Sequence, residues 1–150
     1  MQWSRSDFIR ASAVEVWGLT VDVERWPTIL PTVDTVTLLD TGPLRTGVRA
    51  LIVQPGLRAE WTVRTVEPDH RFVWTTQWHG KPMVAEHIVE SVDGGALNTL
   101  RLSYDGNRRS LLTVLLGPLM RMTLAREAKA FRRAAESAHQ RLQLFEGLHR

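Results

Sequence analysis

Between about Val48 and Tyr104, polar and apolar residues alternate in short segments separated by turn residues. This alternation is typical of antiparallel strands with one buried and one solvated face. If short turns pair the segments as consecutive hairpins, the apolar side chains gather on one side of a curved sheet. That side would carry Trp61, Val63, Phe72, Trp74, Trp78, Met83, Ala85, His87, Val89, Leu100, Leu102 and Tyr104.

Seven strands are predicted in all. Their expected ranges are Trp3 to Ala11, Thr32 to Asp40, Gly47 to Gln54, Leu57 to Glu67, Arg71 to Trp78, Met83 to Val92 and Leu97 to Tyr104. The turns expected between the last four are Pro68-Asp69, Gly80-Lys81 and Gly94-Gly95. These turns place Val63 opposite Trp74, and they place His87 between Trp74 and Leu102.

Two short helices are predicted between the first two strands. Ser12 and Glu15 have the spacing of a capping box, so a helix should run from Ala13 to about Thr20. Its buried side chains would be Val14 and Trp17. Asp22 is expected to cap a second short helical turn that reaches Trp26.

The C-terminal third predicts a long amphipathic helix. Its apolar residues recur at intervals of three and four, which places them on one face of a helix. They are Leu112, Leu116, Leu119, Met120, Leu124, Ala128, Phe131, Ala135, Ala138, Leu142 and Phe145. Pro118, directly after Gly117, predicts a kink or a new helix start.

The composition predicts one ordinary globular domain over residues 1–150. With no cysteine, the chain has no disulfide, thiolate nucleophile or cysteine-based zinc site. A net charge of +3 is small for a nucleic-acid-binding protein, so we expect no nucleic-acid partner. No signal peptide is visible at the N-terminus, which favours a cytoplasmic location.

A short apolar run, Leu111 to Leu116, follows Arg108 and Arg109. The run is too short to span a membrane, so any membrane contact there would be transient. The sequence leaves the oligomeric state open between a monomer and a homodimer.

Several local phrases resemble the helix-grip superfamily (START-like, or SRPBCC), which includes START lipid-transfer domains, birch-pollen-allergen-like proteins and the polyketide cyclase/dehydrase group. The matching phrases are Ala13 to Trp17, Asp22 to Pro27, Leu44 to Val48, Glu60 to Val63, Arg71 to Trp74 and the helix near Gly117-Pro118. The resemblance covers essentially the whole chain. It implies an α+β fold in which a curved seven-stranded antiparallel sheet wraps around the C-terminal helix. The heavy use of Arg over Lys hints at a bacterial source.

The resemblance also implies a cavity between the sheet and the C-terminal helix. We expect it to bind a hydrophobic small molecule such as a lipid, a polyketide or a polycyclic compound. An alternative is a polyketide aromatase/cyclase or dehydrase that acts on a ligand in the same cavity. A second alternative is a protein-interaction module whose interior is filled by the tryptophans. No cofactor is general to this superfamily, and none is expected here.

His87 is the candidate catalytic residue, because it is the one readily titratable group on the predicted apolar face. Three roles remain open for it: a buried core histidine, a ligand contact and a proton shuttle. The residues expected to contact a ligand are Trp26, Trp61, Trp74, Trp78, Met83, His87, Leu102, Tyr104, Met120 and Leu124. The five histidines do not converge, so no metal site is expected.

Overall fold

The computed structural model describes residues 1–107 and 109–150. Arg108, one of the two arginines considered for membrane contact, lies outside the described residues. The elements are β1 (Gln2–Ile9), α1 (Ala13–Val21), the 3₁₀ turn η1 (Val23–Arg25), α2 (Trp26–Ile29), β2 (Thr35–Leu38), β3 (Arg49–Gln54), β4 (Leu57–Glu67), β5 (Arg71–Trp78), β6 (Lys81–Val92), β7 (Gly95–Tyr104) and α3 (Leu111–Leu148).

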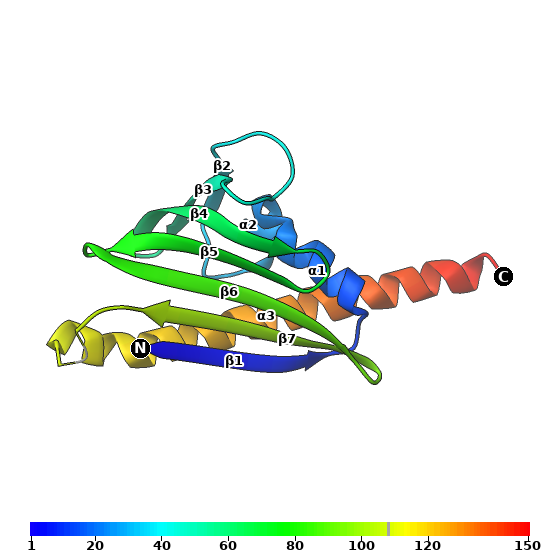
Figure 1. The fold of residues 1–150 in the computed structure, drawn as a ribbon. Coiled ribbons are helices and arrows are strands. Elements are labelled where there is room, and N and C mark those ends of the chain that lie inside the picture. Colours follow the sequence, from blue (N-terminus) through cyan, green and yellow to red (C-terminus); the bar gives the residue numbers. More distant parts are fainter. Residues whose placement is uncertain (108) are drawn as a thin grey trace.

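The seven strands form one antiparallel sheet in the order β1-β7-β6-β5-β4-β3-β2. The sheet curves around α3, and α1 and α2 pack against α3 beside it (Figure 1). The space between sheet and helix holds a continuous apolar core that includes Phe72, Leu100 and Phe131. The predicted architecture, with its two short helices and long terminal helix, is therefore confirmed.

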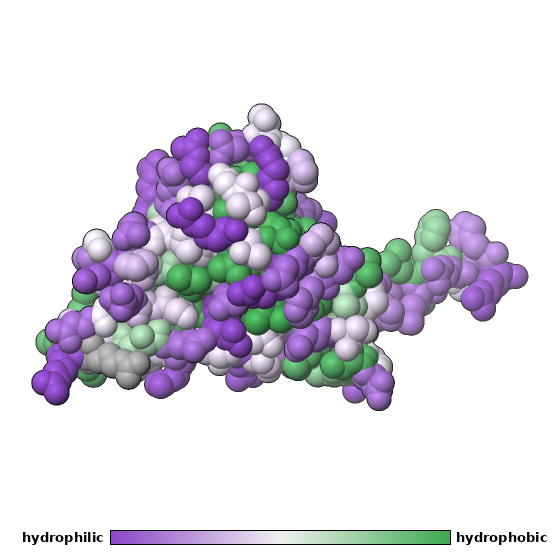
Figure 2. Space-filling model, viewed as in Figure 1, coloured by the Kyte–Doolittle hydropathy of each residue, from purple (hydrophilic) through white to green (hydrophobic). Residues whose placement is uncertain are grey.

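Helix α3 is a single helix of 38 residues that continues through Pro118. The predicted new start at this proline is wrong, since the helix begins at Leu111 and is continuous to Leu148. The C-terminal end of α3 projects beyond the sheet (Figure 1), and it carries mostly polar residues with exposed Leu142 and Phe145 among them (Figure 2). Among the described residues, no helix has a stretch long and apolar enough to cross a membrane.

Two hairpin turns lie one residue earlier than predicted. Strands β5 and β6 are joined by His79-Gly80, where both residues have positive φ (48° and 70°), as a type I′ turn requires. Strands β6 and β7 are joined by Asp93-Gly94, with Gly94 at a φ of 81°. The predicted turns Gly80-Lys81 and Gly94-Gly95 are wrong, because the glycine takes the second position of each turn.

These turns shift the predicted strand pairing by two residues. His87 lies opposite Phe72 and Leu100 instead of Trp74 and Leu102. A shift of two residues keeps every side chain on its side of the sheet, so the predicted apolar face is retained. Val63 pairs with Trp74 as predicted, because a bulge after Val63 compensates for the three-residue turn at 68–70.

Helix α1 begins at the predicted capping box. The Ser12 hydroxyl accepts a hydrogen bond from the Glu15 N–H (3.2 Å), and the Glu15 carboxylate accepts one from the Ser12 N–H (2.7 Å). The prediction that Val14 is buried is wrong, since its exposed fraction is 66%. Val16 and Thr20, four residues apart, face the core, and Val14 lies on another side of the helix.

Two further details differ from the prediction. Asp22 makes no capping hydrogen bond, and its carboxylate instead lies 3.7 Å from the Arg25 guanidinium. Strands β2 and β3 are shorter than expected, because 30–33 form a turn before Thr35 and 45–48 a turn before Arg49.

Replacing Ser12 with Ala is expected to lower the free energy of unfolding by about 1 kcal/mol, because the Glu15 N–H loses its acceptor. Urea denaturation measures this loss. Ser4→Ala, at an exposed position of β1, is the control and is expected to change stability by less than about 0.5 kcal/mol. Equal losses in both variants would show that the capping bond does not stabilise the fold.

Candidate functional site: a cavity beneath the sheet

A cavity of about 320 Å³ lies between the inner face of the sheet and the first half of α3. Most residues expected to contact a ligand line it, namely Trp26, Trp61, Trp74, Trp78, Met83, His87, Leu102, Met120 and Leu124. Four tryptophans therefore surround the space without filling it. The filled interior required by the protein-interaction alternative is not found.

One cross-strand row of residues on the inner face of the sheet contributes to the cavity. Trp74 pairs with Ala85, and Ala85 pairs with Leu102, so a single methyl group stands between two large side chains. All three residues line the cavity. From the other side, Leu116 and Leu124 of α3 line the cavity. The small side chain of Ala85 thus helps to keep the cavity open.

His87 lies in the wall of the cavity with an exposed fraction of only 4%. Its ring stacks on Phe72 at 4.6 Å and meets Trp26 at 5.2 Å. Nδ1 has no hydrogen-bond partner among the described residues. Burial lowers the pKa of His87 to about 3, so the imidazole is neutral at neutral pH. A neutral ring can share a hydrogen bond, but it is a poor proton acceptor at neutral pH.

Two tryptophans in the cavity wall also carry unpaired polar atoms. The indole nitrogens of Trp26 and Trp61 are buried and have no acceptor within the described part of the chain. Each unpaired buried donor costs about 1–3 kcal/mol. With His87 Nδ1, three such nitrogens belong to the wall of one cavity.

Glu127 is a cavity residue that sequence reasoning missed. It lies on α3, is half-buried and lines the cavity. The Thr32 hydroxyl donates a hydrogen bond to its Oε1 atom (2.9 Å), and Thr32 lines the cavity as well. Burial raises the pKa of the Glu127 carboxyl to about 7, although the bond from Thr32 acts in the opposite direction.

A signal for Glu127 is present in the helical pattern. It lies three residues after Leu124 and four before Phe131, so it shares the apolar stripe of α3 with both. A carboxyl in such a stripe faces the interior. The expectation of a single titratable group on the cavity therefore has to be corrected, because α3 supplies a second one.

Tyr104 is the one predicted contact residue outside the cavity lining. It is buried, its ring lies 5.2 Å from that of Trp78, and its hydroxyl donates to the Trp78 carbonyl at 3.4 Å. Trp78 does line the cavity. The structure thus places Tyr104 behind the wall, where it supports Trp78.

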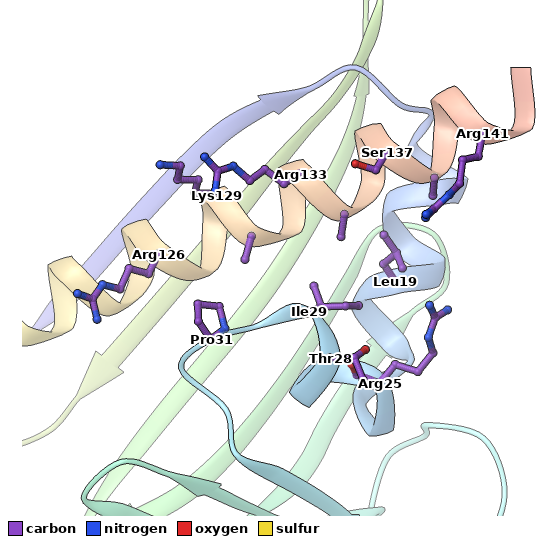
Figure 3. A pocket seen from close by; sticks show the side chains of 13 residues that line it. Leu19, Arg25, Thr28, Ile29, Pro31, Arg126, Lys129, Arg133, Ser137 and Arg141 are labelled. Carbon is purple, nitrogen blue, oxygen red and sulfur yellow. The ribbon is translucent and has the colours of Figure 1, made fainter. Parts of the chain in front are cut away.

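A second depression lies between α1, α2 and α3 (Figure 3). Its basic residues stand around an apolar floor that includes Leu19 and Ile29. They are Arg25, Arg126, Lys129, Arg133 and Arg141. Pro31 and Arg126 line both this basic groove and the cavity, so the two spaces adjoin. Within 1–107 and 109–150, no group of three or more His, Asp or Glu side chains is placed to hold a metal ion.

Solved structures share this fold over nearly the whole chain. TTHA0849 from Thermus thermophilus is 19% identical with a TM-score of 0.73, covering 92% of this chain and 99% of that one. The crystal structure of Ara h 8.0201 is 10% identical with a TM-score of 0.73, covering 91% of this chain and 98% of that one. The di-domain ARO/CYC BexL from the BE-7585A biosynthetic pathway is 17% identical with a TM-score of 0.69, covering 93% of this chain and 50% of BexL.

No curated protein matches the sequence. At such low identities the solved structures show the fold, which is that of the pollen-allergen-like helix-grip proteins. The model of one family, described as polyketide cyclase / dehydrase and lipid transport, matches residues 2–142. With 141 of 150 residues matched, the chain belongs to the polyketide cyclase/dehydrase and lipid transport family.

Proposed function

We propose that the protein binds a hydrophobic small molecule in the cavity between the sheet and α3. The observation that carries this proposal is a hollow of about 320 Å³ whose wall is largely aromatic and aliphatic. Ligand cavities of such composition commonly measure roughly 300–1,000 Å³. A lipid, a polyketide or a polycyclic compound would pack its apolar surface against the flat indole rings of the wall. Burial of its apolar area would supply about 25 cal/mol per Å².

The polar atoms of the wall would orient such a ligand. We propose that His87 contacts it as a neutral hydrogen-bond partner, since an imidazole with a pKa of about 3 is a poor proton acceptor at neutral pH. A ligand oxygen near Trp26 or Trp61 would supply the acceptor that their indole nitrogens lack. Tyr104 would act only through Trp78.

The second candidate function is catalysis in the same cavity, as in polyketide cyclisation or dehydration. The family description and the ARO/CYC structure BexL name this kind of chemistry. Within this chain, Glu127 favours it, because a carboxyl with a pKa of about 7 can both accept and release a proton near neutral pH. The catalytic role predicted for His87 would then pass to Glu127. The cytoplasmic location and bacterial source stay predictions.

Replacing Ala85 with Phe is expected to fill the gap between Trp74 and Leu102. Binding of a polarity-sensitive apolar probe, N-phenyl-1-naphthylamine, should then weaken by at least tenfold, because the ring occupies the space of the probe. Fluorescence titration measures the dissociation constant. Urea denaturation checks that the variant remains folded.

Val84→Phe is the matched control, since it adds a ring on the outer face of the same strand. It should leave the dissociation constant within about twofold of the original value. The proposed function would be wrong if the original protein did not bind the probe, or if Ala85→Phe bound it as tightly as Val84→Phe does.

A further inference from the structure

Glu127 is a carboxyl that the fold does not neutralise. Its Oε1 atom accepts one hydrogen bond from Thr32, and no donor contacts Oε2 within the described residues. No Lys, Arg or His side chain described here forms an ion pair with it. Placing an ionised carboxyl in an apolar wall is costly unless a cation or further donors accompany it. Because Glu127 lines the cavity, a ligand bound there can supply a donor or a cation to this carboxyl.

The other charged groups around the cavity do not supply that partner. On α3 the neighbouring Arg126 is exposed, and on the strands Glu86 is paired with Arg71 (2.9 Å) and Arg101 (3.5 Å). His87 of β6 is neutral at neutral pH. Arg101 of β7 also lines the cavity, and it is the cation paired with Glu86. The remaining lining residues carry no charge, including those of α2, β3, β4, β5 and the turn at 31–33. Inside the cavity, Glu127 is thus the acid that lacks a cation.

Building on the proposed function, we infer that Glu127 and Thr32 recognise an amino group, so that the preferred ligand is an apolar, ring-containing amine. The rings lie against the indoles of the wall. The ammonium donates hydrogen bonds to the Glu127 carboxylate, of which Oε2 is free to accept. Because Glu127 is half-buried, the ion pair is partly shielded from water, which makes it stronger than a fully exposed surface pair. A neutral alcohol can offer only a hydrogen bond at the same position.

If the inference is right, amine binding should release protons and depend on pH. In the free protein the Glu127 carboxyl is about half protonated at pH 7. An ammonium favours the carboxylate, so amine binding lowers this pKa and releases part of a proton. The affinity for an amine should therefore rise between pH 6 and pH 8, as the carboxylate forms. The affinity for the matched alcohol should change little over that range.

Three naphthalene probes with the same ring system test the inference by isothermal titration calorimetry. They are 1-naphthylmethylamine, 1-naphthylmethanol and 1-naphthylacetate, which offer a cation, a neutral group and an anion. The amine is expected to bind at least tenfold more tightly than either other probe at pH 8, and its advantage should shrink at pH 6. At pH 7 the heat of binding should depend on the ionisation enthalpy of the buffer, as proton release requires.

The substitution Glu127→Gln should remove the preference for the amine and its proton release, while the alcohol still binds. Glu136→Gln, on the same helix but outside the cavity lining, is the matched control and should retain both. If Glu127→Gln does not fold, the pH dependence and proton release of the original protein still decide the question.

Three results would overturn the inference. Binding of the alcohol or the acetate as tightly as the amine would refute amine recognition and leave the proposed cavity function standing. Failure of all three probes to bind would remove both. An amine preference that persists in Glu127→Gln would show that another group binds the ammonium.

Discussion

His87 is expected to cause a loss of about 3 kcal/mol in the free energy of unfolding when the pH falls from 7 to 4, and replacing it with Leu should remove this loss. In the unfolded chain the imidazole binds a proton with its ordinary pKa of 6.5, whereas burial keeps it neutral in the folded state down to about 3. As the pH falls below 6.5, the unfolded state binds more protons and folding loses free energy. A leucine of similar volume removes this loss.

Glu127 is expected to produce the opposite pH dependence. Its folded-state pKa of about 7 lies above its ordinary value of 4.5, so the folded state holds a proton that the unfolded state releases. This difference destabilises the fold at pH 7, and the penalty disappears on acidification, for a gain of about 2–3 kcal/mol by pH 4. The effects of His87 and Glu127 on the pH dependence of stability therefore nearly cancel in the original protein. Glu127→Gln should reveal the full acid sensitivity caused by His87.

Urea denaturation at pH 7, 5.5 and 4 measures these effects in the original protein, His87→Leu, Glu127→Gln and the double variant. The single variants should depart from the original in opposite directions, and the double variant should follow the original. Parallel stability curves for His87→Leu and the original protein would contradict the assignment, because they would mean that His87 is protonated in the folded state.

The inner face of the sheet could be predicted from the sequence because alternation has a period of two. The predicted turns before His87 and after it were each misplaced by one residue, and the pairing moved by two. Since an even shift preserves the face, His87 remains on the apolar side. Strand alternation is therefore robust for deciding which side chains face inwards, and weak for deciding which of them are neighbours.

The shape and polar contacts of the cavity depend on which side chains lie next to one another. These neighbours could not be predicted from the sequence. The gap at Ala85 exists because Trp74 and Leu102 flank it in one row, which the predicted pairing did not show. The bond between Thr32 and Glu127 joins residues 95 positions apart, and no local pattern indicates such a distant contact. The same holds for Tyr104, whose place behind Trp78 follows from the true register of β6 and β7.

Phe131→Ala is expected to cause the largest loss of stability, about 3–5 kcal/mol, because it opens a void where α3 meets the sheet. Phe131 is 1% exposed, and its ring meets the edges of Trp26 at 5.8 Å and His87 at 6.1 Å. Removing the ring deletes both aromatic contacts along with the buried apolar area. Urea denaturation at pH 7 measures the difference.

Phe145→Ala provides the control on the same helix, since its side chain is 62% exposed on the part of α3 that projects beyond the sheet. This change should alter the free energy of unfolding by less than about 0.5 kcal/mol. Similar losses at both positions would indicate that the projecting end is buried in solution. A small loss at Phe131 alone would indicate that α3 does not pack into the sheet, and the cavity beneath it would then lack a wall.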